Sequence, residues 1–392
     1  MKERVDLVIR AGYVITMGSR GVIRRGAIAV RNGVIVEVGT AESIDSRYRG
    51  DEVVDRGRDS IAMPGLVDCH THTQQLLLRS AISDGLLALP PIWTKLLVPF
   101  ESRLSRRLAY ISSLASAAAM ARNGTTFFIE AGGPYPDAVA QAAEEVGIKA
   151  AVTPSFYNVL EGRVVEEESR VRERLLAVRR LRGRYTRPWC SVRQVMMVTP
   201  RLLEEVAEVC RDGAYSGLTM HLAEYQGEVD YTLTAAGLRP LEYVERLGLL
   251  DLGKPVVLAH GVYVSPHEAW VLARRRNVSV CWCPTVDSWL MGLHWLGLRY
   301  VDTLFGVGSD GGAFSELDLL HEVKVARAVA KALSVSISYT KTVLTPAEIL
   351  AAATGAGGRV VGEKVGVLEP GYAADIVVLD GRRLHGAPVH SP

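Results

Sequence analysis

Apolar and polar positions alternate along the chain with two different periods, and the change of period divides the sequence into three parts. In residues 1–60, apolar residues recur at every second position or in short runs broken by turn residues, as in residues 5–9 and 34–38. That period is typical of β-strands. Asn32-Gly33 lies between two apolar runs and predicts a hairpin, because both central residues of such a turn need positive φ. We therefore expect a small β-sheet domain here.

Residues 61–360 alternate short apolar runs with longer segments whose apolar residues recur three or four apart. Several of the longer segments have Pro in the first turn after Ser or Thr, which is typical of a helix start. Repeated strand–helix units predict a parallel sheet, and eight of them predict a closed (β/α)8 TIM barrel. The expected strands are residues 66–72, 125–129, 150–154, 190–198, 217–221, 255–260, 278–283 and 304–310, and the expected helices are 105–122, 137–146, 166–181, 200–211, 241–247, 266–276 and 346–353.

Residues 366–379 return to the β pattern, with a turn at Pro370-Gly371 followed by a continuous apolar run. Two β segments that flank a long α/β middle predict one small domain built from both termini. We therefore expect an α/β protein in which a TIM barrel of residues 61–360 is inserted in a small β-sandwich-like domain of residues 1–60 and 361–392.

Composition narrows the class of protein. Hydrophobic residues make up 48% of the chain and charged residues 22%, and the net charge is only +2, which is typical of a globular protein. The arginines of residues 170–187 lie among glutamates, a pattern that favours a solvated helix face over a nucleic-acid surface. The N-terminus lacks the apolar core of a signal peptide, and the apolar segment 108–121 is too short for a bilayer. We expect a cytoplasmic protein that binds neither nucleic acid nor membranes.

The cysteines indicate no disulfide scaffold. There are five, an odd number scattered over a long chain. Cys281 and Cys283 have the spacing of half a zinc ribbon, but no matching second pair exists. We expect both to be buried thiols on a strand.

Histidines and one aspartate fall at the ends of the expected strands. His70 and His72 end the first strand, and two positions apart they point to the same face. His221 ends the fifth strand, His260 the sixth and Asp310 the eighth. A lone pair of this kind also fits histidines on an amphipathic edge strand. Five such residues together predict a site on the carboxyl rim of the barrel, where barrel enzymes build their active sites.

Motifs along nearly the whole chain carry a family resemblance. They are Arg-Asn-Gly at 31–33, M-P-G-L-V-D-C-H-T-H at 63–72, M-H-L-A-E at 220–224, L-A-H-G-V-Y at 258–263, G-S-D-G at 308–311 and G-V-L-E-P-G-Y-A-A-D-I-V-V-L-D at 366–380. With these, the chain resembles the amidohydrolase superfamily, in its mononuclear cytosine-deaminase-like branch. That branch includes S-adenosylhomocysteine and methylthioadenosine deaminases, guanine deaminase and triazine hydrolases. Many relatives continue with further strands after the last motif, so we expect the second part of the small domain to be reduced.

The resemblance implies a metal site. In it, His70, His72, His221 and Asp310 hold one divalent ion, and water completes the coordination. Neutral imidazoles with one carboxylate suit Zn²⁺ or Fe²⁺, so zinc is the first expectation and iron the alternative. Relatives with two metals carry a bridging lysine, commonly at the end of strand four, and residues 190–198 contain none. We expect one ion.

The resemblance also implies the catalytic residues. Glu224 follows His221 by three residues, so it can act as a general acid and base toward the attacking water; the alternative is an exposed glutamate paired with an arginine. His260, together with Asp310, is expected to orient that water and to polarise the electrophilic carbon.

Departures from the family pattern bear on the substrate. Adenosine-type deaminases of the branch usually read P-H-x-P-Y after strand four, whereas this chain has Arg193 followed by Gln194. The substrate-contacting histidine of the motif is therefore replaced by Gln194, and this difference argues against a nucleoside substrate. After strand seven Asp287 replaces a neutral amide, which favours a cationic or donor-rich substrate edge. We expect Trp93, Arg193, Gln194 and Asp287 to contact substrate. An Arg193–Asp287 salt bridge that only braces the rim is the alternative. Trp289 and Trp295 are further candidates for stacking a ring, although ordinary packing explains tryptophans equally well.

Three functions remain at this point. The first is a hydrolytic deaminase of an aminated N-heterocycle such as a purine, pyrimidine, pterin or triazine, with water as co-substrate. The second is a related metallohydrolase that displaces chloride or an alkylamine, or opens a cyclic amide. The third is a catalytically silent binding protein on the same fold, which the retention of every ligand and of Glu224 disfavours. A homo-oligomer is compatible with the sequence.

Overall fold

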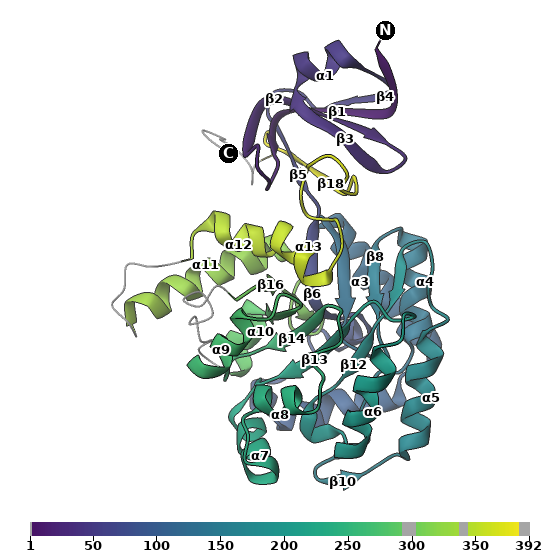
Figure 1. The fold of residues 1–392 in the computed structure, drawn as a ribbon, viewed down its shortest axis with the longest axis vertical. Helices are drawn as coiled ribbons and strands as arrows, with labels where there is room; N and C mark the ends of the chain where they lie inside the picture. Colours follow the sequence, from purple (N-terminus) through teal and green to yellow (C-terminus); the bar gives the residue numbers. More distant parts are fainter. Residues whose placement is uncertain (1, 292–302, 337–343, 384–392) are drawn as a thin grey trace. The chain divides into compact units, whose positions relative to one another are not determined.

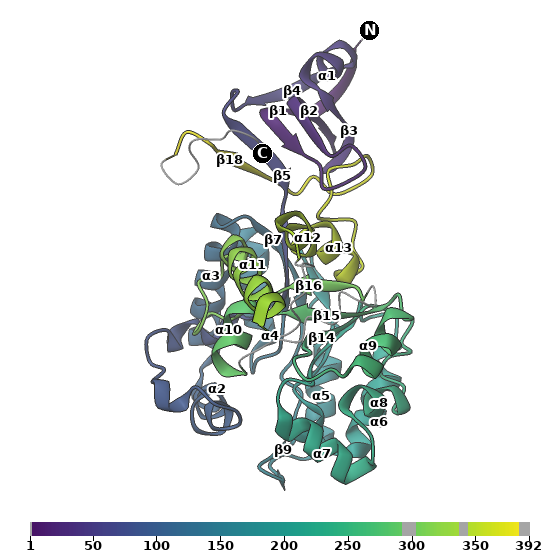
Figure 2. The same ribbon diagram turned by 90° about the vertical axis from the view of Figure 1, so that its left-hand side faces the viewer.

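The structure is a computed structural model that describes residues 2–291, 303–336 and 344–383 of the chain (Figures 1 and 2). It forms two compact units. The first consists of Met1–Val67, Ala353–Arg359 and Glu363–Pro392, and the second of Asp68–Ala352 and Val360–Gly362. Among the described residues no helix is both long and apolar enough to cross a membrane.

The first unit is built around a six-stranded sheet in the order β18-β5-β1-β2-β3, with β4 paired to β1. Asn32 and Gly33 form the β2–β3 turn with φ of 53° and 73°, which confirms the hairpin. Alternate residues of β2 enter two separate cores: Ile28 and Val30 pack on one face, and Ala27 and Ala29 pack with Ile44 of α1 on the other. The elements are β1 (Glu3–Ile15), β2 (Val22–Arg31), β3 (Val34–Thr40), α1 (Ala41–Arg47), β4 (Tyr48–Asp55), β5 (Ser60–Pro64) and β18 (Ile376–Asp380).

The second unit is the TIM barrel. Its strands form two five-stranded parallel sheets, β11-β8-β7-β6-β17 and β12-β13-β14-β15-β16. The two sheets join into one ring because strand four of the ring is divided into β11 and β12, and strand eight into β16 and β17. The elements are β6 (Leu66–His72), β7 (Thr125–Glu130), β8 (Lys149–Val152), β11 (Thr186–Pro188), β12 (Cys190–Val192), β13 (Leu218–Leu222), β14 (Val256–His260), β15 (Val278–Trp282), β16 (Phe305–Val307) and β17 (Asp310–Gly311). This confirms the expected fold class and the order of the eight strands.

Helices form the outer layer around these strands (Figures 1 and 2). Their apolar faces pack on the sheet; Leu202, Leu203 and Val206 of α6, for example, share one buried cluster with strand residues Leu218 and Val256. The helices are α2 (Val98–Arg103), α3 (Arg106–Arg122), α4 (Pro136–Val146), α5 (Glu168–Val178), α6 (Pro200–Cys210), α7 (Gln226–Ala236), α8 (Pro240–Arg246), α9 (Pro266–Ala273), α10 (Pro284–Leu290), α11 (Leu319–Ser336) and α12 (Pro346–Ala352), while α13 (Gly355–Val361) contains residues of both units and β9 (Val159–Leu160) and β10 (Arg163–Val164) form a short hairpin.

Two local expectations need correction. Strand four ends at Val192, and residues Val195–Met197 form a 3₁₀ turn instead of continuing the strand. The chain also contains one disulfide, Cys190–Cys210, which joins β12 to the end of α6. A single bridge is not a disulfide scaffold, but no sequence pattern predicted the pairing of these two cysteines. Cys281 and Cys283 are buried free thiols, as expected.

Candidate active site

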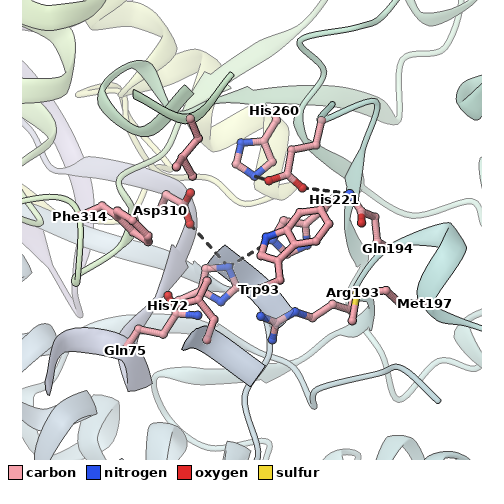
Figure 3. A pocket seen from close by; sticks show the side chains of 13 residues that line it. His72, Gln75, Trp93, Arg193, Gln194, Met197, His221, His260, Asp310 and Phe314 are labelled. Carbon is pink, nitrogen blue, oxygen red and sulfur yellow. Dashed lines mark hydrogen bonds and ion pairs between the residues drawn. The ribbon is translucent and has the colours of Figure 1, made fainter. Parts of the chain in front are cut away.

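The carboxyl ends of the barrel strands bring the predicted polar residues together. His70 and His72 come from β6, His221 from β13, His260 from β14 and Asp310 from the start of β17. Each is at least 92% buried, since none exceeds 8% exposure. Figure 3 shows His72, His221, His260 and Asp310 converging on one cavity. His260 and Asp310 have positive φ values of 70° and 56°, a backbone strain that is common at functional sites.

The distances among four of these side chains fit a metal ion. His72 Nε2 lies 3.2 Å from His221 Nε2, and Asp310 Oδ1 lies 3.7 Å from His70 Nε2 and 3.6 Å from His72 Nε2. Tetrahedral zinc with ligands at about 2.1 Å holds neighbouring ligand atoms about 3.4 Å apart. Neither ring nitrogen of His70 has a hydrogen-bond partner among the described residues. These buried, convergent donors therefore suit one divalent ion.

Electrostatics keeps the three imidazoles in the form that binds metals. The pKa values of His70, His72 and His221 lie well below the ordinary value for histidine. Burial is the main cause, because it penalises the charged ring, and the neighbouring imidazoles add to it. Neutral imidazoles carry the lone pair that coordinates a metal ion.

Glu224 lines the same cavity and lies after β13 and before α7. It is buried, and its Oε1 lies 3.8 Å from His260 Nε2. Burial raises the pKa of its carboxyl group to about 7, and the nearby carboxylates of Asp310 and Asp287 contribute in the same direction. A carboxyl group with a pKa near neutrality can both accept and release a proton. The alternative of an exposed, arginine-paired glutamate does not match this environment.

His260 is hydrogen-bonded to Asp287 through Nδ1, the ring nitrogen that does not face Glu224. Its Nδ1 lies 2.7 Å from Asp287 Oδ1, and both residues are 1% exposed. The other oxygen of Asp287 accepts the backbone N–H of Cys283 at 3.2 Å. Burial lowers the pKa of His260, but the carboxylates of Glu224 and Asp287 outweigh it and raise this pKa to about 10. His260 therefore points a protonated Nε2 toward Glu224 and the cavity.

Other residues complete the lining of the cavity. Trp93 lines it and packs edge-on against Tyr225, with ring centroids 5.2 Å apart. Arg193, also in the lining, pairs with Glu101 of α2 at 2.7 Å. The second oxygen of Glu101 accepts Gln75 Nε2 at 2.9 Å. The remaining lining side chains are mainly apolar: Leu97, Met197, Leu290 and Phe314.

The structure therefore places three of the four expected substrate contacts in the cavity lining and the fourth outside it. Trp93, Arg193 and Gln194 line the cavity, whereas Asp287 is not part of the lining and lies behind His260. The Arg193–Asp287 salt bridge considered as an alternative is not what the structure shows, because each residue has another partner. Trp289 lies on α10 with 55% of its surface exposed, away from the lining, and Trp295 lies outside the described residues.

Several residues of the site escaped the sequence argument. Glu228, on the first turn of α7, is fully buried and accepts the backbone N–H of Glu224 at 3.0 Å. Asp68 accepts the hydroxyl of Ser309 at 2.6 Å and so joins the two strands that carry metal ligands. Their spacing from neighbouring site residues, four after Glu224 and two before His70, was the available signal. Glu101 gave none, because it lies 92 positions from its partner.

Comparison with known proteins identifies the family. The model of the amidohydrolase family matches residues 61–390. The chain belongs to the amidohydrolase family. It is 31% identical over 406 residues to a 5-methylthioadenosine/S-adenosylhomocysteine deaminase of Pelotomaculum thermopropionicum, covering 98% of this chain and 87% of that protein. A 5'-deoxyadenosine deaminase of Methanopyrus kandleri is 30% identical, with coverages of 98% and 88%.

Solved structures of other amidohydrolases share the fold. An adenosine deaminase from Xanthomonas campestris with bound zinc matches all of this chain and 88% of its own, with a TM-score of 0.89 and 27% identity. An atrazine chlorohydrolase from Arthrobacter aurescens, complexed with zinc, matches with a TM-score of 0.86 over 98% of this chain and 89% of its own. At 22% identity, this second likeness concerns the fold alone.

Proposed function

We propose that this amidohydrolase is a metal-dependent hydrolytic deaminase of an aminated N-heterocycle. The observation that carries the proposal is the position of Glu224, a buried carboxyl group with a pKa of about 7, in a cavity that His72, His221 and Asp310 also line, with His70 beside these two histidines. That set provides a site for an ion, a proton carrier and a place for a small ring. The relatives named above act on adenosine derivatives, which supports this reaction class.

His70, His72, His221 and Asp310 would hold the ion, and we propose one ion per chain, zinc before iron. When bound, such an ion lowers the pKa of a coordinated water to about 7 and thereby supplies a nucleophile at neutral pH. No lysine occurs between Cys190 and Val198 to bridge a second ion.

Glu224 carries the proton in this proposal. Its carboxylate takes a proton from the attacking water and passes it to the ring nitrogen next to the reacting carbon. It then takes the second proton from the new C–OH group, which becomes C=O, and delivers it to the departing amine. One C–O bond forms and one C–N bond breaks, so water enters and ammonia leaves. A pKa near 7 suits both transfers, because neither the acid nor the base form is then strongly favoured.

His260 acts as a fixed positive group. Asp287 holds its Nδ1, so Nε2–H is directed at the cavity and can orient water and stabilise negative charge that develops on the oxygen. Asp310 accompanies it from strand eight of the barrel.

Purine derivatives are the first substrate class to test, because of the relatives, and pyrimidines, pterins and triazines follow. Trp93 offers a face for stacking the ring. We further propose that the protein works in the cytoplasm, and a homo-oligomer remains compatible with the structure.

A screen for ammonia release tests the function. Zinc-loaded protein is incubated with aminated purines, nucleosides, pyrimidines, pterins and triazines, and ammonia is quantified with a coupled assay. We expect at least one compound to release ammonia in proportion to enzyme, and the Glu224→Gln protein, prepared identically, to release far less. Release of chloride or alkylamine without ammonia would replace deamination by the second metallohydrolase function. No release of any leaving group would contradict the proposal.

A further inference from the structure

Gln194 occupies a special position between two buried carboxyl groups. It lies two residues after the end of β12, lines the cavity and is 1% exposed. Its amide Nε2 lies 3.0 Å from Glu224 Oε2 and 3.4 Å from Glu228 Oε2. The amide therefore donates toward the proton carrier of the proposed reaction and toward the residue that holds the backbone of that carrier.

The two carboxyl groups determine which way the amide faces. An isolated glutamine amide can be turned over with little consequence, because its oxygen and nitrogen occupy similar space. Here a turned amide would place its oxygen against two carboxyl oxygens and take one hydrogen-bond donor away from each. Glu228 Oε2 also accepts the N–H of Glu224, while Glu228 Oε1 has no partner among the described residues. Oε2 thus stays an acceptor whether or not Oε1 carries a proton.

The fixed orientation leaves Gln194 Oε1 as an acceptor without a donor. This oxygen is buried and has no hydrogen-bond partner among the described residues. Buried acceptors are nearly always satisfied, and one that is not indicates a missing partner. Because Gln194 lines the cavity (Figure 3) and its amide contacts Glu224 there, a bound ring can supply that partner.

We propose that Gln194 Oε1 selects substrates that carry a hydrogen-bond donor, an amino group or ring N–H, on the ring edge facing Glu224. This inference rests on the proposed function and narrows its substrate class. Glu224 protonates the ring nitrogen next to the reacting carbon, so the donor belongs on the ring atom beyond that nitrogen. In a purine that reacts at C6, this atom is C2. The preferred substrates are therefore 2-amino-substituted 6-aminopurines over those with hydrogen at C2.

Matched substrate pairs test the selection. The kcat/KM values of zinc-loaded enzyme are measured for adenine against 2,6-diaminopurine and for adenosine against 2-aminoadenosine. We expect the 2-amino member to be favoured by at least about tenfold, the size typical of pairing a buried polar group. Because the amino group also changes ring reactivity, the deciding comparison is Gln194→Met, which removes the acceptor at similar volume. In the Gln194→Met protein, the ratio of kcat/KM for the 2-amino compound to kcat/KM for its partner should fall to near one.

Two further measurements keep the proposal testable. Met197→Leu alters the same cavity wall without removing an oxygen or nitrogen atom, so its ratio should stay near that of the original protein. Calorimetry with purine and 2-aminopurine measures the contact without turnover, because neither compound has an amino group at C6. We expect the original protein to bind 2-aminopurine about tenfold more tightly than purine. The Gln194→Met protein should bind the two compounds equally.

The outcomes separate the two proposals. Ammonia release with equal ratios in the original and Gln194→Met proteins would overturn the role of Gln194 and leave deamination standing. Tighter binding of 2-aminopurine with no ammonia from any compound would support the role of Gln194 and contradict deamination. Equal binding of purine and 2-aminopurine without any turnover would overturn the role of Gln194 as well.

Discussion

At the scale of single residues, the environment of the cavity shifts the pKa values of its ionisable groups in opposite directions. Burial lowers the pKa values of His70, His72 and His221, whereas it raises that of Glu224 to about 7. His260 is the exception among the histidines, because Glu224 and Asp287 raise its pKa to about 10. Neighbouring groups whose pKa values are shifted apart in this way are typical of acid–base catalysis.

The proton transfer proposed for Glu224 gives the first prediction. Glu224→Gln keeps the shape and can still accept from Gln194, but an amide cannot carry the proton. We expect kcat to fall by about 10² to 10⁴, with metal content and the circular dichroism spectrum unchanged. Near-normal kcat in a metal-replete Glu224→Gln protein would assign the proton transfer to another residue.

Asp287 gives the second prediction. Because it holds His260 Nδ1 at 2.7 Å and does not line the cavity, Asp287→Asn should lower kcat by about ten- to a hundredfold while KM and the ranking of substrates stay the same. Removing the carboxylate also lowers the pKa of His260, so the alkaline limb of the pH profile should move to lower pH.

The control for this change is Asp251→Asn, which removes a largely exposed carboxylate that pairs with Arg275 and does not line the cavity. A change in substrate ranking of tenfold or more in Asp287→Asn would instead restore the direct substrate contact expected from the sequence. Loss of stability without any movement of the pH profile would indicate a bracing role only.

The sequence predicted the residues of this site better than their partners. His70, His72, His221 and Asp310 could be placed because strand alternation and strand ends fix where they point. Arg193 was expected at the rim, but its partner Glu101 comes from a short helix whose position depends on the whole fold. Side-chain pairing across 92 positions is decided by tertiary packing and has no local pattern.

At the scale of elements, α10 and α11 show how a buried carboxyl group joins two helices. Glu322 of α11 accepts the backbone N–H of Thr285, on the first turn of α10, at 3.0 Å. Burial raises the pKa of Glu322 to about 8, although the hydrogen bonds from Thr285 oppose the shift. The protonated carboxyl group is therefore favoured in the folded protein.

This shift gives the third prediction. An unfolded glutamate titrates near pH 4.5 and the folded one near 8, so the folded state binds this proton more tightly. The stabilisation is fully present below about pH 4.5 and is lost as pH rises to about 8. Each pKa unit corresponds to about 1.4 kcal/mol. Glu322→Gln cannot ionise, so its free energy of unfolding at pH 9 should exceed that of the original protein by several kcal/mol.

Denaturant unfolding at pH 5 and pH 9 measures this difference. Glu316→Gln, an exposed carboxylate nearby in the sequence, is the matched control and should change little at either pH. Equal or lower stability of Glu322→Gln at pH 9 would show that Glu322 is ionised and satisfied in the folded state.

The elements themselves were predicted where their period was plain. All eight barrel strands were found, yet α11, the longest helix, was missed. Its buried residues Leu319, Ala326, Ala330 and Leu333 recur at helical spacing, so the signal existed. Strand four was extended too far because residues 195–198 are all apolar, and an apolar run alone does not distinguish a strand from a buried turn.

At the scale of the whole molecule, ring closure brings strands one, five and eight to the proposed metal site. Two of the proposed ligands come from β6, one from β13 and one from β17, and β17 pairs with β6. Strand period and motif order were enough to predict this convergence. The division of the chain at residues 60 and 360 stays a prediction, beside the two compact units that the structure shows.

Metal content gives the last prediction. Because the ligands come from both sides of the ring, an ion should bind the folded chain far more tightly than the unfolded one, and it stabilises folding by about 2.7 kcal/mol when free metal is a hundred times its Kd. We expect elemental analysis to find one divalent ion per chain, zinc or iron. Chelation should lower the melting temperature and abolish activity, and zinc should restore both.

The His72→Ala protein should lose the ion and the response to chelation. The control is His267→Ala, which replaces an exposed histidine with 77% side-chain accessibility and should keep both the ion and the response. Two ions per chain, with activity following the second, would contradict a mononuclear centre, and an unchanged melting temperature after complete chelation would show that the ion does not tie the strands together.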